Sequence, residues 1–238
     1  MAQIFHPSTN TIAKASIFGA AFFILGAFWV LGQIVRSSYF TGVNDAIEQP
    51  VQFSHEHHVA GLGIDCRYCH VSVETAAYAG MPATKTCMTC HSQIWTNAAI
   101  LEPVRASWRN DTPIQWTRVH DLPDFVQFNH SIHVQKGIGC FSCHGNVGGM
   151  PLMWKTASLN MEWCLDCHRA PEKHIRPKGP GNQNIFVMAD WLPEWGDRPA
   201  VAKQLLEKYH VRSAPIGDPH EGLEFHPSPM INCSVCHY

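Results

Sequence analysis

Five copies of one short motif constrain what this chain of 238 residues can fold into. In each copy two cysteines are separated by two residues and followed directly by a histidine, and the copies together use all ten cysteines. From the first motif to the fifth, the cysteines are Cys66 and Cys69, Cys87 and Cys90, Cys140 and Cys143, Cys164 and Cys167, and Cys233 and Cys236. The histidines that follow them are His70, His91, His144, His168 and His237. Any fold of this chain has to present five such sites.

The motif predicts covalent attachment of c-type haem, because Cys-x-x-Cys-His is the spacing of that attachment. The two thiols add to the haem vinyl groups as thioethers, and the adjacent imidazole becomes the proximal iron ligand. Structural disulfides would need neither the spacing nor the histidine. Zinc ribbons use two such pairs per site, so five pairs leave one over, and a thioredoxin-like motif would occur once, in a βαβ context that is absent here. We therefore predict five c-type haems with iron, and no cysteine in a disulfide.

A repeat ahead of the first and third motifs supplies candidates for the second iron ligand. Residues Phe53–Val59 and Phe128–Val134 both read Phe-x-His-x-x-His-Val, and in each copy a Met-Pro pair and another motif come later. Residues three apart project from one side of a helix, so we expect a short helix or turn in each copy. The four predicted distal ligands are His55, His58, His130 and His133.

The distal ligand of the fifth haem has three candidates. His226 precedes the fifth motif by seven residues, as His133 precedes the third. His120 is the second candidate. Met150 is the third, and its thioether would raise the haem potential, although the same side chain could simply pack in the core. His57 breaks the repeat and is not expected to bind iron. With every iron six-coordinate, no substrate can bind at a haem, and we expect outer-sphere electron transfer with no catalytic residues.

The N-terminal region is expected to anchor the chain in a membrane. From Ala15 to Val35 only Ser16 and Gln33 are polar, and at about 1.5 Å per residue this helix would span the hydrocarbon layer of roughly 30 Å. A cleaved signal peptide would have a shorter apolar region and a small-residue cleavage site after it. Haem c is attached on the outer face of the bacterial cytoplasmic membrane, so residues from about 37 onward are expected outside and His6 inside.

The expected fold is a multihaem cytochrome c, similar to class III, with short helices and loops around five haems and one N-terminal transmembrane helix. Strand patterns are scarce, and the best ordinary helix is expected at Arg198–His210. A net charge of −2 gives no attraction to nucleic acid. The expected segments are a cytoplasmic tail over 1–14, the anchor over 15–36, a tether over 37–50, two-haem modules over 51–100 and 101–172, and a segment over 173–238 with the fifth haem.

Four stretches of the sequence resemble one known family. They are Phe5–Lys14 ahead of the anchor, Ala79–Ile94 around the second motif, Leu122–Val134 ahead of the third, and Trp163–Arg169 around the fourth. In these stretches the chain resembles the membrane-anchored pentahaem cytochrome c component of bacterial alternative complex III, a quinol-oxidising assembly. Its two-haem halves are also similar, less specifically, to class III cytochromes c.

The resemblance implies a single-pass subunit of the bacterial cytoplasmic membrane that passes electrons from menaquinol to a monohaem cytochrome c or a soluble carrier, in a respiratory or photosynthetic chain. It implies partners: an iron–sulfur, molybdopterin-like subunit and polytopic quinol-binding membrane subunits. Two alternatives stay open. One is an anchored quinol dehydrogenase that acts alone and feeds periplasmic reductases. The other is a multihaem enzyme such as a nitrite reductase, which needs a haem with an empty position.

Overall fold

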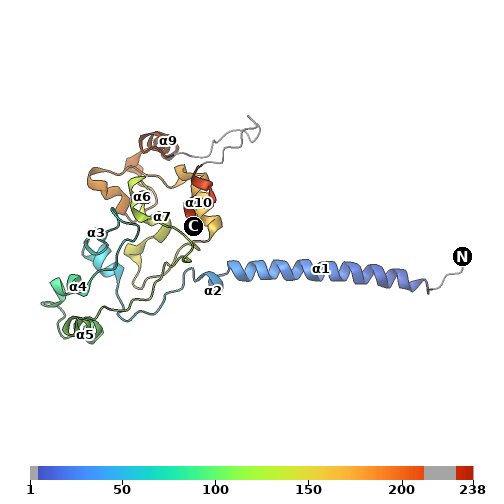
Figure 1. The fold of residues 1–238 in the computed structure, drawn as a ribbon, viewed down its shortest axis with the longest axis horizontal. Coiled ribbons are helices and arrows are strands. Elements are labelled where there is room, and N and C mark those ends of the chain that lie inside the picture. The colour runs from blue at the N-terminus through green and yellow to red at the C-terminus, as the bar shows by residue number, and fades with distance from the viewer. Residues whose placement is uncertain (1–4, 212–228, 238) are drawn as a thin grey trace. The chain divides into compact units, whose positions relative to one another are not determined.

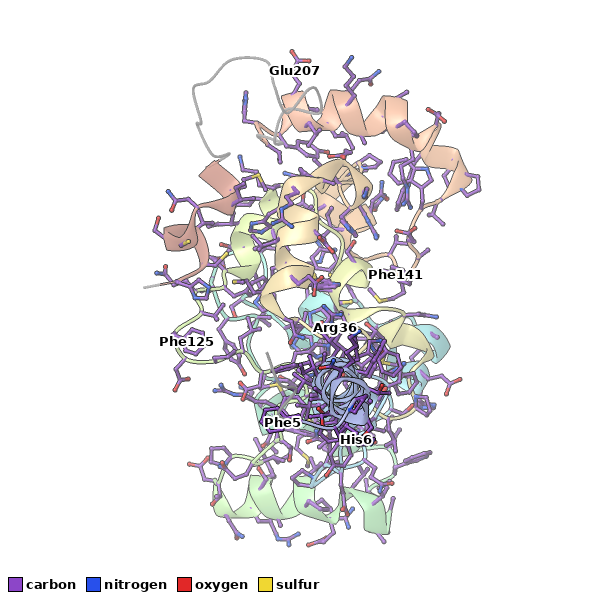
Figure 2. All side chains as sticks on the ribbon, turned by 90° about the vertical axis from the view of Figure 1, so that its right-hand side faces the viewer. Phe5, His6, Arg36, Phe125, Phe141 and Glu207 are labelled. Atoms are coloured by element: carbon purple, nitrogen blue, oxygen red, sulfur yellow. The ribbon has the colours of Figure 1, made fainter. Side chains whose placement is uncertain are left out.

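The first of two compact units is an apolar helix. The computed structural model describes residues 5–211 and 229–237, and its units are Met1–Val43 and Asn44–Tyr238. In the first unit, α1 (Ser8–Arg36) is followed by the single turn of α2 (Ser38–Thr41). By length and composition α1 can cross a membrane, with a mean hydropathy of 2.0. No residue of α1 is buried, and Figure 2 shows its side chains pointing outward on all sides. The helix contains the expected anchor and begins before it.

The second unit is built from short helices and loops. Its α-helices are α3 (Cys66–Cys69), α4 (Thr84–His91), α5 (Glu102–Asn110), α6 (His130–Gln135), α7 (Cys140–His144), α8 (Met161–Arg169), α9 (Arg198–Lys208) and α10 (Cys233–Cys236). The described residues also form one π-helix, η1 (Glu56–Gly61). The 3₁₀ turns are η2 (Ala99–Leu101), η3 (Val147–Gly149), η4 (Pro171–Lys173), η5 (Pro180–Phe186), η6 (Pro193–Trp195) and η7 (Pro229–Ile231). Over 5–211 and 229–237 there is no strand, only three isolated bridges. The expected helix-and-loop fold is confirmed.

Each of the five motifs lies on a short helix. The helices are α3, α4, α7, α8 and α10. One-turn helices are unstable alone, because nucleation fixes several residues for one hydrogen bond. Side-chain caps offset part of this cost: Asp65 accepts a hydrogen bond from the Arg67 amide, and Asn232 accepts one from the Ser234 amide. The residue before the first cysteine therefore starts the helical turn in the first and fifth motifs.

The two copies of the Phe-x-His-x-x-His repeat differ in helix type. The second copy forms the α-helix α6, whereas the first forms the π-helix η1. The first copy has one extra residue between Phe53 and Cys66, compared with Phe128 and Cys140. A π-helix closes its hydrogen bonds over one more residue per turn, as the bond from the Leu62 amide to the His57 carbonyl does here. The extra residue is therefore absorbed within the turn.

The apolar core of this unit is divided into three small clusters. The first contains Val73, Val134, Ile185 and Phe186; the second Val51, Leu101 and Val104; the third Ile175, Ala202 and Leu205. Three motif cysteines pack against them: Cys66 and Cys140 on the first cluster and Cys87 on the second. A unit of this length normally has one contiguous core. Its core here is interrupted at the positions where the motifs lie.

The clusters follow the order of the helices in space. The second cluster joins α4 to α5 at one end of the unit, and the third packs under α9 at the other end, with α6 and α7 between them (Figure 1). The expected helix at Arg198–His210 is confirmed as α9, which ends slightly earlier, at Lys208. Its N-cap Asp197 accepts a hydrogen bond from the Ala200 amide, and Leu205 belongs to the third cluster, against which Tyr209 packs.

Candidate haem sites

Three predicted distal histidines each face a motif histidine. The rings of His58 and His91 have centroids 6.2 Å apart, those of His130 and His144 6.4 Å, and those of His133 and His168 6.3 Å. An imidazole nitrogen lies about 2 Å from a bound metal and about 1.1 Å from its own ring centre, so two imidazoles across one metal ion have centroids about 6.2 Å apart. All three pairs have the separation of axial ligands on opposite sides of one iron.

Backbone carbonyls hold the Nδ1 atom of five of these six rings and also that of His70 in the first motif. Because a carbonyl can only accept, each Nδ1 donates, and Nε2 is left to bind a metal. The six bonds run from His58 to Ser54 (2.8 Å), His70 to Gly80 (2.7 Å), His91 to Ile94 (3.3 Å), His130 to Ala77 (2.7 Å), His133 to Asn129 (2.7 Å) and His168 to Met230 (2.7 Å). Such partners fix the tautomer and orientation of metal-binding histidines. No sequence pattern marks these carbonyls, since any residue type supplies one.

The phenylalanine of the repeat orients both histidines of its copy. Phe53 stacks on His58 at 4.3 Å and meets His55 edge-on at 4.9 Å. In the second copy Phe128 stacks on His133 at 4.6 Å and meets His130 edge-on at 4.7 Å. Aromatic pairs of this kind contribute about 0.5–1.5 kcal/mol beyond burial. The matching ring geometry in both copies explains why phenylalanine is part of the Phe-x-His-x-x-His repeat.

The remaining predicted distal histidine, His55, lies near the first motif. Burial, followed by the smaller effects of the charges of His70 and His58, lowers its pKa to about 4. Its buried Nδ1 has no hydrogen-bond partner in the described part of the chain. A neutral imidazole with an unsatisfied nitrogen suits a metal, which binds only the neutral ring. In the same way burial lowers the pKa of His144, in the third motif, to about 3.

The motif cysteines are free thiols, and all except Cys90 and Cys233 are partly buried. None of the ten forms a disulfide in the structure. Burial raises the pKa of the Cys143 thiol to about 12 and that of Cys167 to about 11. A thiol held neutral among apolar groups fits a thioether to a porphyrin better than a thiolate metal site. Over the described residues, no three His, Cys, Asp or Glu side chains form a set that could hold a metal ion. Haem iron needs only two protein ligands, which is the number of imidazoles in each facing histidine pair.

The candidates for the fifth distal ligand lie in different places. His226 lies outside the described residues. His120 lies beside the third motif, with its ring 4.3 Å from that of His144, and its buried Nε2 has no hydrogen-bond partner among the described residues. Met150 is 1% exposed, and its carbonyl accepts a bond from the Glu56 amide at the start of η1. His237 instead lies beside Phe125, with ring centroids 5.8 Å apart.

The other histidine next to the repeat, His57, has different surroundings. Its ring stacks on Trp95 at 6.0 Å. The side chain is exposed, unlike its half-buried neighbour His58. It has no motif histidine opposite it among the described ring contacts, so its role as a ligand is not supported.

The first three motifs are neighbours in the order second, first, third. The second and first are joined by a 3.0 Å hydrogen bond between the hydroxyls of Thr89 and Tyr68. The first and third share one apolar cluster, against which Cys66 and Cys140 both pack. The bond from His130 to the Ala77 carbonyl joins the same two regions. The first motif therefore lies between the second and the third.

The last two motifs continue this series. Helix α6 carries both His130 and His133, which face the third and the fourth motif respectively. His168 of the fourth motif donates to the Met230 carbonyl in η7, directly before the fifth motif. Cys164 also lies close enough to Cys236 for its pKa to be raised by it, after the larger effect of burial. The order of neighbours is second, first, third, fourth, fifth.

Facing histidines beside Cys-x-x-Cys-His turns, in a fold of helices and loops, define a multihaem cytochrome c. Residues 51–101, which hold the first two motifs, match the family of cytochrome c7 and related cytochromes c. The chain is also similar to a protein described as a menaquinone reductase, multiheme cytochrome c subunit, from Nitratidesulfovibrio vulgaris. The two are 29% identical over 154 residues, which cover 60% of this chain and 67% of the relative. The family model and the relative both support c-type haem and electron transport.

Proposed function

We propose that this chain is the pentahaem electron-transfer subunit of a membrane complex that exchanges electrons with the menaquinone pool. The observation that carries the proposal is the set of three histidine pairs with centroids 6.2 to 6.4 Å apart, each joining a predicted distal ligand to a motif. When bound, each haem supplies a one-electron iron couple. The chain's own residues would fix the porphyrins through thioethers, and Nδ1 hydrogen bonds to backbone carbonyls orient six of the proposed axial imidazoles.

The pairing of ligands follows one rule in both two-haem modules. The first histidine of the repeat pairs with the first motif of its module, and the second with the second. The pairs are His55 with His70, His58 with His91, His130 with His144, and His133 with His168. For His237, the spacing favours His226, with His120 and Met150 as rivals. Because both axial positions are filled from the protein, the chain transfers electrons without binding substrate at iron.

The helix α1 anchors the chain, and the haem unit lies on the outer face of the cytoplasmic membrane. Support comes from the apolar length of α1 and from the covalent haem motifs, whose attachment takes place outside. The N-terminus with His6 is then inside.

The complex that fits the sequence best is alternative complex III, with menaquinol as donor. Its iron–sulfur, molybdopterin-like subunit and its polytopic subunits would deliver electrons, and a monohaem cytochrome c or a soluble periplasmic carrier would accept them. The resemblance of the chain to the pentahaem component of that complex supports this assignment. A second candidate rests on the relative from N. vulgaris, which is described as a menaquinone reductase subunit. In such a complex the same cytochrome would carry electrons in the opposite direction, toward the quinone.

Purification from native membranes in mild detergent tests these assignments. We expect five haems per chain by haemochrome assay and co-purification of the iron–sulfur and polytopic subunits. Added menaquinol should reduce the haems of the complex but not those of the isolated cytochrome. Rapid reduction of the isolated cytochrome would instead favour a quinol dehydrogenase that acts alone. Oxidation of pre-reduced haems by menaquinone, without reduction by menaquinol, would favour a menaquinone reductase.

A further inference from the structure

One buried cation in the described part of the haem unit has no acidic partner. Arg176 is 1% exposed. Its guanidinium donates only to backbone carbonyls, those of Val187 (3.0 Å), Asn184 (3.3 Å) and Asp190 (3.4 Å). Its Nε is buried without a hydrogen-bond partner among the described residues. Burying a charge without a countercharge is costly.

The nearest acidic group is already engaged. The Asp190 carboxylate pairs with Arg198 at 2.6 Å on the surface. Over the described residues, no carboxylate lies within ion-pair distance of the Arg176 guanidinium. The face of this guanidinium is covered by the Trp195 ring, whose centre lies 5.4 Å from Cζ. The positive charge of Arg176 is therefore neither neutralised nor exposed to water.

The backbone places this charge against the third motif. Ile175 forms a bridge with Ile138, and the Arg176 amide donates to the Gly137 carbonyl at 2.9 Å. The guanidinium lies directly against Gly139, so that a methyl group there would overlap it. Gly139 immediately precedes Cys140, the first thioether residue of the third motif. Helix α9 holds this arrangement through Leu205, which packs on Ile175 in the third apolar cluster.

We propose that Arg176 sets the reduction potential of the haem held by Cys140 and Cys143. The proposal rests on the proposed function, since it requires a haem at the third motif. A ferric haem that gains an electron loses one positive charge, so a nearby fixed cation favours the reduced state. The effect is strong where burial keeps the local dielectric constant low and salt cannot screen the charge. The third motif is also the middle of the series of five.

The alternative is that Arg176 only ties together the loop carbonyls of residues 184–190. A neutral side chain that packs equally well then changes stability but not potential. A lysine, which keeps the charge but not the planar set of donors, then disturbs the loop as much as the neutral variant does. Charge and packing therefore make opposite predictions for the two substitutions.

The experiment compares potentials in the full-length chain in detergent. Arg176→Met removes the charge and Arg176→Lys keeps it, and Arg169→Gln serves as the matched control. Arg169 also lies next to a motif, but its side chain is 55% exposed and lies 3.7 Å from Asp166. Potentials are measured by optical redox titration. His130→Met marks the step of the third haem, because a thioether ligand raises its potential.

We expect Arg176→Met to lower one of the five steps, the one raised by His130→Met. The shift should be tenfold or more in the reduction equilibrium constant, and each factor of ten corresponds to 59 mV for one electron. In Arg176→Lys the potential of the third haem should stay close to that of the wild type. In Arg169→Gln the reduction equilibrium constants of all five haems should stay within about threefold of the wild-type values. Arg176→Gln keeps amide donors for the carbonyls and replaces the methionine variant if that variant does not accumulate.

Two kinds of failure can be told apart by peptide mass spectrometry. A variant that carries haem on Cys140 and Cys143 but has unshifted potentials overturns the role of Arg176. Equal shifts in the lysine and methionine variants overturn it as well, because they assign the effect to packing. A wild-type chain without haem on these two cysteines overturns the proposed function itself.

Discussion

The rings of His130 and His144 lie nearly parallel, with an interplanar angle of 10° and centroids 6.4 Å apart. His130 begins α6, whereas His144 ends α7. The hydrogen bond from His130 to the Ala77 carbonyl prevents the ring from rotating freely. In the second motif the corresponding rings, His58 and His91, are inclined at 63°. The two sites therefore hold their imidazoles in different relative orientations.

Electron paramagnetic resonance should separate these two haems. Parallel axial imidazole planes give ferric haem a rhombic low-spin signal, and steeply crossed planes give a signal with a much larger highest g value. We expect the crossed-plane signal to disappear in His58→Ala and the rhombic spectrum of the third haem to persist. Loss of the rhombic component instead would contradict the pairing of His58 with His91.

Two adjacent histidines should behave oppositely on substitution. His58→Ala should leave one iron five-coordinate, so that carbon monoxide binds about one fifth of the reduced haem, while the wild type binds none. His57→Ala is the control, because its exposed ring stacks on Trp95 and faces no motif histidine among the described ring contacts. The measurement is the Soret shift on addition of carbon monoxide. Equal binding by both variants would show that His58 is not an axial ligand.

Whether the fifth motif binds a haem can be tested by counting the covalently bound haems. Cys236→Ala and Cys233→Ala together should yield a chain with four covalent haems in place of five, measured as intact mass. Ser234→Ala changes a residue between the two cysteines and should leave five, because it removes only the 3.3 Å side-chain hydrogen bond to Asn232. A wild-type mass that corresponds to four haems would remove the fifth site.

Gly139 should not tolerate a side chain. In Gly139→Ala the new methyl group would overlap the Arg176 guanidinium. Backbone carbonyls and the Trp195 ring surround this guanidinium. Overpacking of this kind costs typically about 1–3 kcal/mol. The comparison is Gly61→Ala, where the nearest atom lies at an ordinary 3.6 Å. Chemical denaturation followed by haem absorbance gives both values, and a Gly139→Ala variant as stable as Gly61→Ala would show that Arg176 can move away.

The features predicted correctly from sequence are those encoded locally. The motif turns and α9 depend on residues a few positions apart, such as the Asp197 cap with Pro199 in the first turn. The Phe-x-His-x-x-His pattern likewise has the same ring contacts in both copies, although the helix type differs. The domain boundaries proposed from the repeat stay predictions.

Features that depend on distant contacts were not predictable. The carbonyl that holds His168 belongs to Met230, 62 residues later, and the one that holds His130 lies 53 residues earlier. Neither residue type carries a signal, because the backbone supplies the acceptor. The position of His120 beside His144 was not predictable either, because it depends on a contact between residues that are distant in sequence. Arg176 gave no signal either, since a lone arginine in a sequence is normally a surface residue.

One consequence follows from the presence of His130 and His133 on the single short helix α6. Three residues along a helix correspond to a rise of about 4.5 Å, so this helix itself fixes how far apart the third and fourth sites are. Loops elsewhere in the unit can lengthen or shorten without changing this distance. Because electron tunnelling slows steeply with separation, the register of one helical turn would determine the rate between the two haems proposed at these sites.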